Sequence, residues 1–190
     1  NETGIIAIST VSGGGATENG TQTTTITITE NDSAPTVTLS SSASSIAENA
    51  GSSLTLTATL SNATTADVTV SFSYTGTGTA GGTDYANVSD IVISAGSTTG
   101  TASFTPVDDS TFEGDETAIV AIDTVSGGSA TESGSQTVTI TISEDDSGPS
   151  FSINDVTTSD ESATTHTFTV TLSSASGVTA TVDYATSDGT

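Results

Sequence analysis

Carboxylates gather in four short segments of this sequence, and each segment flanks a stretch of alternating apolar residues. The segments read AEN at 47–49, GGTDY at 81–85, VDDSTFEGDET at 107–117 and ISEDDSGP at 142–149. Carboxylates that pack together without a cation repel one another and raise one another's pKa. A hard cation such as Ca²⁺ removes that conflict, because it takes about six to eight oxygen ligands. Oxygen ligands, with Cys absent and one His in the chain, argue against zinc or copper.

The charge balance of the chain is one-sided. Lys and Arg are absent and Asp plus Glu number 23, which gives a formal net charge of -23. Nucleic acids and anionic membrane surfaces are therefore excluded as partners, since both are bound through Lys and Arg. General acidity for solubility is the alternative explanation. The acids are unevenly spread, however, because five lie between Asp108 and Glu116 while residues 91–107 contain none.

The elements that must position these acids recur along the chain. The stretch from Thr10 to Pro35 returns from Thr124 to Pro149, so corresponding residues are 114 apart. Self-similarity at a period of this length indicates an array of whole domains. We therefore expect the C-terminal part of one repeat at 1–33, a complete repeat at 34–147 and the N-terminal part of the next at 148–190. The third copy aligns residues 167–173 with 55–61, an offset of 112.

Period-2 alternation of apolar residues with Thr and Ser predicts β-strands within the complete repeat. The predicted strands are 36–40, 53–61, 67–74, 88–94, 101–107, 117–124 and 135–143. About seven such strands indicate an all-β fold of tandem immunoglobulin-like antiparallel β-sandwiches, with no helix. The residues expected to be buried are Val37, Leu56, Phe72, Ile93, Phe104, Phe112, Ile122 and Ile140.

The threonine runs of these strands allow two interpretations. They form the wet face of amphipathic strands, where Thr is favoured, or a flat array that binds ice or another crystal surface. A disordered low-complexity chain is a further alternative, against which the regular alternation argues. No apolar run approaches the roughly 18 residues of a membrane span, so no membrane insertion is expected in this segment.

The acidic segments together resemble a known family. The strings I-x-E-N-x-G, G-T-x-x-G-x-D-Y and D-D-x-x-F-E-G-D-E-T, with E-D-D after the last strand, look like a Calx-beta domain. This is a module of sodium–calcium exchangers and of many large bacterial surface proteins. The resemblance covers residues 34–147 and, in part, both flanking fragments. It implies a seven-stranded sandwich with a cluster of calcium ions at one pole.

Carried over position by position, the resemblance implies a set of calcium ligands. The implied ligands are Glu48, Asp84, Asp108, Asp109, Glu113, Glu116, Glu144, Asp145 and Asp146. Asp115 points elsewhere in the family pattern, and Glu144 stands where Asp is more usual. Phe112 is expected to anchor its loop in the core, and Tyr85 is expected to serve packing.

The flanking copies keep part of this pattern. The first fragment has Glu2 and a terminal stretch of Glu30, Asn31 and Asp32, in which Asn31 replaces one acid. The third copy offers Asp160 and Glu161 near the position of Glu48.

Three classes of function remain open at this stage. The first is a calcium-binding structural array in an extracellular or cell-surface stalk, adhesin or fibre, whose partners are neighbouring repeats of the same protein or polymer and a surface ligand elsewhere. The second is a calcium-sensing regulatory module, as Calx-beta domains are in exchangers. The third is an enzyme or a carbohydrate-binding module. No nucleophile–base pair is visible, and five Phe, three Tyr and no Trp are few for a sugar platform, so no catalytic activity is expected.

Overall fold

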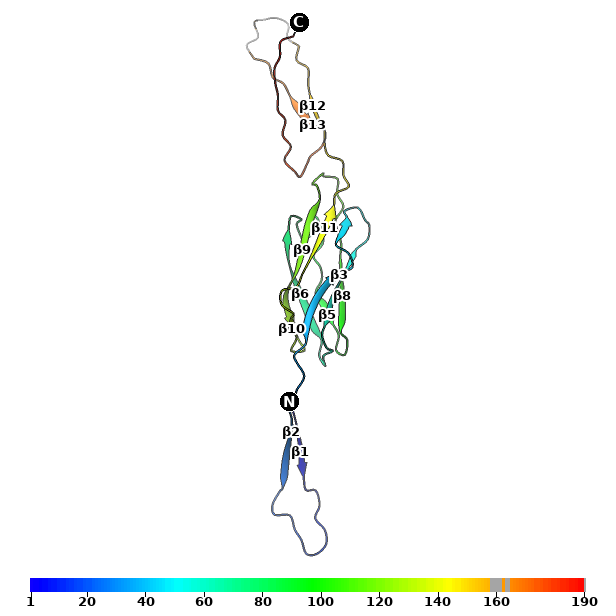
Figure 1. Ribbon diagram of the computed structural model, residues 1–190, viewed down its shortest axis with the longest axis vertical. Coiled ribbons are helices and arrows are strands. Elements are labelled where there is room, and N and C mark those ends of the chain that lie inside the picture. Colours follow the sequence, from blue (N-terminus) through cyan, green and yellow to red (C-terminus); the bar gives the residue numbers. More distant parts are fainter. Residues whose placement is uncertain (158–161, 163–164, 190) are drawn as a thin grey trace. The chain divides into compact units, whose positions relative to one another are not determined.

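The computed structural model describes residues 1–157, 162 and 165–189, and its regular elements are all strands (Figure 1). The predicted all-β class is thereby confirmed. The chain divides into two compact units, Asn1–Ala34 and Pro35–Thr190. Among the described residues, no helix is long and apolar enough to cross a membrane.

Two sheets build a sandwich in the larger unit. The four-stranded sheet has the order β10-β3-β5-β8, with β3 at Thr36–Ser41, β5 at Leu54–Leu60, β8 at Thr99–Phe104 and β10 at Thr131–Glu132. The five-stranded sheet has the order β4-β11-β9-β6-β7, with β4 at Ser45–Ala47, β6 at Val68–Gly76, β7 at Ile91–Ile93, β9 at Glu116–Ser126 and β11 at Thr137–Ser143.

All seven predicted strands are present, and two short ones were missed. β4 and β10 are three and two residues long, too short to show an alternation. Both pair in parallel, β4 with β11 and β10 with β3, whereas the long strands pair antiparallel. The predicted antiparallel sandwich therefore needs two short parallel additions at its edges.

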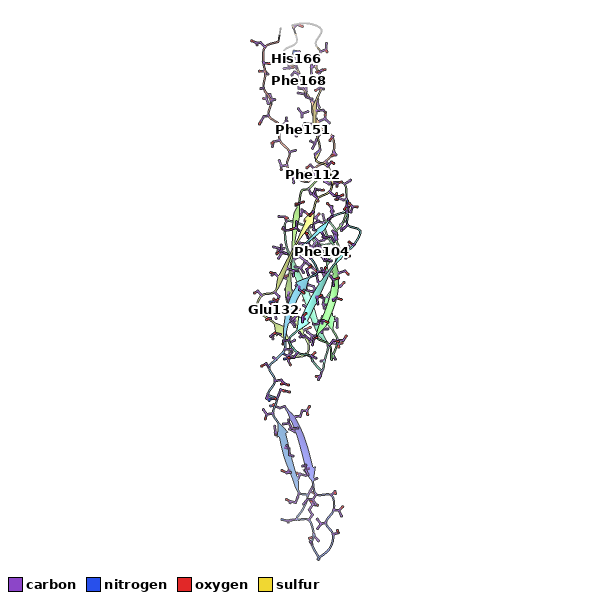
Figure 2. The ribbon with its side chains drawn as sticks, turned by 45° about the vertical axis from the view of Figure 1, so that its right-hand side comes forward. Phe104, Phe112, Glu132, Phe151, His166 and Phe168 are labelled. Atoms are coloured by element: carbon purple, nitrogen blue, oxygen red, sulfur yellow. The ribbon has the colours of Figure 1, made fainter. Side chains whose placement is uncertain are left out.

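The core lies between the two sheets because alternate side chains of each strand point inward. On β5, Leu56, Ala58 and Leu60 are buried while Thr55 is exposed. Of the eight residues predicted to be buried, six are: Val37, Leu56, Ile93, Phe104, Ile122 and Ile140. Phe72 is half-buried against this core. Phe104 lies among the strands of the sandwich (Figure 2), with its ring 5.0 Å from the Tyr85 ring.

The smaller unit is a hairpin of two exposed strands. β1 (Glu2–Ala7) and β2 (Thr23–Ile28) pair antiparallel, with Glu2 opposite Ile28. This register is the one that β9 and β11 adopt 114 residues later, where Glu116 lies opposite Ile142.

Residues after Pro149 form a second two-stranded pairing. β12 (Phe151–Ile153) and β13 (Val170–Leu172) pair antiparallel, with Phe151 opposite Leu172. The corresponding pair in the sandwich is Val37 opposite Leu60. Asp160 and Glu161, the acids expected near a third metal site, lie outside the described residues.

Candidate metal centre

The first group of acids lies where β4 and β11 end. Because β4 runs parallel to β11, with Ala47 opposite Ser143, the residues that follow both strands emerge side by side. The Glu48 N–H donates to the Ser143 carbonyl at 3.0 Å. The first acidic group (Glu48, Glu144 and Asp145) offers one carboxylate oxygen from each residue, all within 4.8 Å of one another.

The second group combines two loops and the start of β9. The Val107 N–H donates to the Asp84 carbonyl at 3.0 Å, which ties the 81–85 segment to the loop that begins at residue 107. Glu116 is the first residue of β9. The second acidic group (Asp84, Glu113 and Glu116) again has one carboxylate oxygen per residue within a 4.8 Å range.

Asp109 connects the two groups electrostatically. Its charge acts on Glu48 of the first group and on Glu113 of the second. The charges of Asp108 and Asp109 also reach Asp146. The structure therefore brings six of the nine implied ligands together in two groups, and the other three interact with them or with one another through their charges. We name the whole set the acidic pole: Glu48, Asp84, Asp108, Asp109, Glu113, Glu116, Glu144, Asp145 and Asp146.

The pKa values of two glutamates of the acidic pole are raised strongly. Burial, with the charge of Glu144 next in weight, raises the pKa of Glu48 to about 7. Burial, followed by the charges of Asp84 and Glu113, raises the pKa of Glu116 to about 7 as well. Burial and then Asp84 also raise the pKa of Glu113. These carboxylates crowd one another, which is the conflict that a cation removes.

Glu144 differs, because the main chain holds its carboxylate. Its Oε2 accepts the N–H groups of Glu113 and Gly114 at 2.5 and 2.8 Å. Its Oε1 accepts those of Asp145 and Asp146 at 3.0 and 2.8 Å. Although burial acts in the opposite direction, these four hydrogen bonds lower the pKa of Glu144. Glu144 thus fastens the 113–114 turn to the terminal acidic stretch.

Local backbone geometry sets the loops of the pole. Gly114 has a φ of +78°, a left-handed conformation that glycine adopts without strain. Asp109 Oδ1 accepts the Thr111 N–H at 2.6 Å, and Asp84 Oδ2 accepts the Thr79 N–H at 2.5 Å. Short polar side chains that bind nearby backbone N–H groups are typical of such turns.

Phe112 does not anchor its loop in the core, and that prediction is wrong. The residue is half-buried at one end of the sandwich (Figure 2), and its ring lies beside Gly148. Its carbonyl accepts the Gly177 N–H at 3.0 Å and the Ser176 hydroxyl at 3.2 Å. The interior next to the loop is filled by Tyr85, which is fully buried. Packing is thus the role of Tyr85, as its position in the sequence indicated.

Two polar residues contribute that the sequence interpretation did not assign. Asn49 Nδ2 donates to Asp145 Oδ2, although only the glutamate of the AEN segment was expected to act. Asp115 accepts the Glu144 N–H through Oδ1 at 3.0 Å, so it supports the pole from outside, consistent with its exclusion from the ligand set. The sequence signal for Asp115 was the repeat, because Asn1 stands 114 residues before it. In the structure the contact recurs there, since Asn1 Oδ1 accepts the Glu30 N–H at 2.7 Å.

The donor set of the pole fits a hard divalent cation. Every candidate ligand atom in the two acidic groups is a carboxylate oxygen, and the chain contains no Lys or Arg that could neutralise them. The buried Tyr85 hydroxyl has no hydrogen-bond partner among the residues that the structure describes, and the charges of Asp84 and Glu116 act on it. Each of the two groups of three carboxylates could hold a metal ion.

Comparison with known families identifies the domain family of the chain. The model of the Calx-beta domain matches residues 30–146 and, a second time, residues 144–190. The chain belongs to the Calx-beta domain family. No curated protein matches this Calx-beta chain.

Three solved structures to which the chain is similar come from Calx proteins. The apo-form Calx CBD1 domain is 19% identical with a TM-score of 0.48, and the match covers 58% of this chain and 99% of that one. CBD12 from CALX1.2 is 17% identical with a TM-score of 0.48, over 62% of this chain and 48% of that one. The calcium binding domain CBD12 of CALX1.1 is 21% identical with a TM-score of 0.46, over 62% and 50%. The Calx-beta chain thus spans about half the length of the two CBD12 structures.

Proposed function

We propose that this Calx-beta chain binds calcium at the acidic pole, and that the bound ions stiffen an array of repeats in an extracellular or cell-surface stalk, adhesin or fibre. One observation carries the proposal: six carboxylates from four sequence segments gather in two groups, and the charge of Asp109 acts on both groups, in a chain that has no cationic side chain. Only bound cations or an outside basic partner can balance that charge.

Calcium is the cation whose coordination suits the pole. It takes six to eight oxygen ligands at about 2.3–2.6 Å and tolerates irregular geometry. The two acidic groups of three carboxylates support two or more ions. Bound calcium would supply positive charge that lets Glu48 and Glu116 stay ionised in their buried places.

The position of the pole along the chain supports a structural role. The terminal acids continue through Gly148 and Pro149 directly into β12. Beside this connection, the Phe112 carbonyl accepts hydrogen bonds from Ser176 and Gly177. Ions at the pole would fix both the loop that makes this contact and the start of the connection. Because the chain has no Cys, no disulfide can take over that task.

Calorimetric titration with calcium, combined with thermal melts and small-angle scattering, tests the proposal. We expect calcium to raise the melting temperature by mass action, about 2.7 kcal/mol at a hundredfold excess over the dissociation constant. In small-angle scattering, the chain should show a narrower distribution of maximum dimensions with calcium than with a chelator.

Asp109→Ala provides the variant for this test and Asp123→Ala its matched control. Asp109 acts on both acidic groups, whereas Asp123 is an exposed acid of β9 outside the pole. Asp109→Ala should weaken calcium binding, and Asp123→Ala should leave it unchanged. Equal affinity in the two variants, or binding that alters neither the melt nor the dimension, would contradict the structural calcium role.

A further inference from the structure

The ring and the hydroxyl of Tyr85 have different environments. The residue is fully buried, and its ring centroid lies 5.0 Å from that of Phe104 and 6.1 Å from that of Tyr74. The hydroxyl, by contrast, has no hydrogen-bond partner within the described part of the chain. A buried hydroxyl without a partner costs free energy that a phenylalanine ring in the same place would avoid. Packing therefore explains the ring of Tyr85 and leaves its hydroxyl without a role.

Two carboxylates that act on Tyr85 belong to the second acidic group. Burial, followed by Tyr74 and then by the charges of Asp84 and Glu116, raises the pKa of Tyr85. A phenol that keeps its proton is a hydrogen-bond donor, and an ionised carboxylate only accepts. The hydroxyl and this group are therefore complementary in hydrogen bonding.

Gly78 marks the place where Tyr85 and Glu116 approach each other. The glycine is buried, and its N–H donates to the Thr117 carbonyl at 3.0 Å. A Cβ added at Gly78 would lie 3.2 Å from Glu116 Oε2 and 3.5 Å from Tyr85 Cε1. Cε1 is the ring carbon next to the one that carries the hydroxyl. The missing side chain thus leaves a small space that the Glu116 carboxylate and the hydroxyl-bearing end of the Tyr85 ring both border.

We propose that the Tyr85 hydroxyl positions Glu116 for a divalent cation in the second acidic group, by donating a hydrogen bond to the Glu116 carboxylate directly or through one water molecule over Gly78. Groups that hydrogen-bond a ligating carboxylate fix its orientation and strengthen metal binding. The inference rests on the proposed calcium binding at the acidic pole. It adds a residue that is not itself a metal ligand and whose expected role was packing alone.

The metal-free and the calcium-bound protein then differ in what they gain from this hydroxyl. In the metal-free protein the buried hydroxyl has no partner, so its removal relieves a cost. In the calcium-bound protein the hydroxyl holds a ligand in place, so its removal weakens binding. The two effects have opposite signs and can be measured separately.

Calorimetric titration with calcium and thermal melts in chelator compare two substitutions that each remove one hydroxyl. Tyr85→Phe should weaken calcium binding about tenfold, while the melting temperature in chelator stays the same or rises. Tyr74→Phe is the matched control, because the Tyr74 hydroxyl donates to the Val88 carbonyl at 2.9 Å. This control should lower the melting temperature in chelator and leave the calcium affinity unchanged. The proposal is overturned by an unchanged affinity in Tyr85→Phe, or by a melting temperature in chelator that falls as far in Tyr85→Phe as in Tyr74→Phe.

The near-ultraviolet absorption of tyrosine provides a second readout, which a purely structural role of Tyr85 would not change. The chain has three Tyr and no Trp, and the third tyrosine, Tyr184, is 92% exposed. A new hydrogen bond of the Tyr85 hydroxyl should shift its absorption band when calcium binds. The calcium difference spectrum should therefore appear in the unchanged chain and in Tyr74→Phe, and disappear in Tyr85→Phe. A difference spectrum that persists in Tyr85→Phe would contradict the role of its hydroxyl.

Asp109→Ala separates this proposal from that of calcium binding at the pole. If Asp109→Ala weakens calcium binding and Tyr85→Phe does not, the role of Tyr85 fails and the calcium proposal stands. If the unchanged chain does not bind calcium, both proposals fail.

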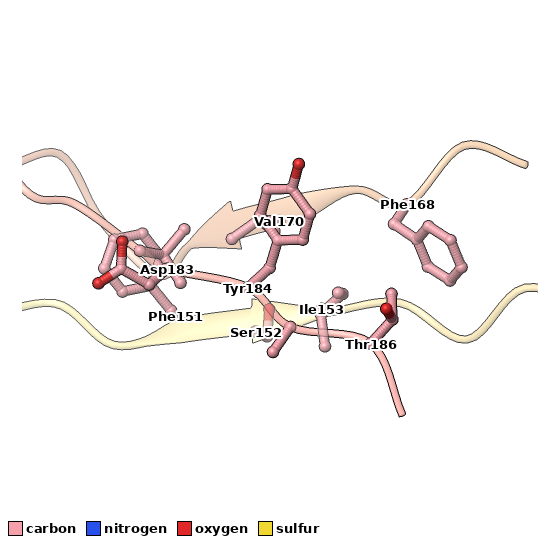
Figure 3. Close-up of a pocket in the computed structure, with 10 residues that line it drawn as sticks. Phe151, Ser152, Ile153, Phe168, Val170, Asp183, Tyr184 and Thr186 are labelled. Atoms are coloured by element: carbon pink, nitrogen blue, oxygen red, sulfur yellow. The ribbon is translucent and has the colours of Figure 1, made fainter. Parts of the chain in front are cut away.

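The hollow on residues 148–190 is a different kind of place (Figure 3). Its lining is mostly apolar and includes Phe151, Phe168 and Tyr184, and it contains none of the residues of the acidic pole. The inference about Tyr85 does not involve it.

Discussion

Two hairpins of this chain share a sequence pattern but differ in what covers them. β1–β2 and β9–β11 have the same register, and their side chains repeat the same hydrogen bonds. Glu18 accepts the Gln22 N–H in the first hairpin, and Glu132 accepts the Gln136 N–H in the second. Yet both strands of the first hairpin are exposed throughout, whereas alternate side chains of the second are buried in the core. Pairing and turn geometry are therefore local properties, whereas burial depends on the rest of the sandwich.

The largest expected difference between the hairpins concerns one isoleucine. Ile140→Ala removes a fully buried side chain and should lower the free energy of unfolding of the sandwich by about 2–5 kcal/mol. Ile26→Ala makes the same change at the bare counterpart and should alter that free energy by less than about 0.5 kcal/mol. Urea unfolding of dilute protein measures both. Similar losses in the two variants would show that the hairpins do not differ in burial.

The pH dependence of the free energy of unfolding distinguishes Glu48, whose pKa is raised by burial, from Glu144, whose pKa is lowered by hydrogen bonds. Burial raises the pKa of Glu48 from 4.5 to about 7, so between these pH values the folded state holds a proton that the unfolded state has lost. Without metal, the free energy of unfolding should therefore fall as pH rises through this window, by at most about 3 kcal/mol from Glu48. Calcium should reverse the trend, because it requires ionised carboxylates.

Thermal melts from pH 4 to pH 8, with a chelator and with calcium, measure this effect. Glu48→Gln is the control: its amide does not titrate, so the metal-free profile should become less steep, and Glu116, whose pKa is also raised to about 7, accounts for slope that remains. By contrast, backbone N–H groups lower the pKa of Glu144 and also that of its counterpart Glu30. The titration of Glu144 and Glu30 therefore changes the free energy of unfolding below pH 4.5, outside this window. A metal-free profile that rises between pH 4.5 and 7 would contradict the assignment of Glu48.

A smaller effect is expected where the copies differ by one acid. Asp145 belongs to the first acidic group, and its counterpart is Asn31. Asp145→Asn should weaken calcium binding about tenfold, or about 1.4 kcal/mol, because one ligand loses its charge. Calorimetric titration measures the change, and Asp123→Asn provides the charge-matched control. Unchanged affinity in Asp145→Asn would remove Asp145 from the ligand set.

The smallest effect concerns the residue that supports Glu144. Asp115 Oδ1 accepts the Glu144 N–H at 3.0 Å, and Asn1 Oδ1 accepts the Glu30 N–H at 2.7 Å. Asp115→Asn should therefore be nearly neutral, whereas Asp115→Ala should lower the free energy of unfolding by about 0.5–1.5 kcal/mol. Chemical denaturation at saturating calcium compares the two. Equal destabilisation by Asn and Ala would mean that charge, rather than the hydrogen bond, matters at this position.

The sequence predicted the sandwich because alternation identifies half-buried strands wherever these are long. β4 was not predicted because three residues cannot show an alternation. Its parallel pairing with β11 nevertheless places Glu48 beside Glu144. The resemblance to the Calx-beta family implied the six acids that form the two groups, but not that the Glu144 carboxylate binds four backbone N–H groups. The prediction that Phe112 anchors its loop in the core was wrong, because the fold fills that part of the interior with Tyr85.

The hydrogen bonds of Glu144 bear on how such repeats can diverge. They recognise peptide groups and not side chains, so residues 113, 145 and 146 can change without releasing the loops. The first hairpin already illustrates this, since Glu30 accepts the N–H groups of Asn31 and Asp32 although Asn31 has replaced an acid. The shape of the loops therefore depends on backbone hydrogen bonds, whereas the metal ligands are side chains, so the two can change independently. A lineage of these domains can tune the metal preference of individual copies while every copy keeps the same frame.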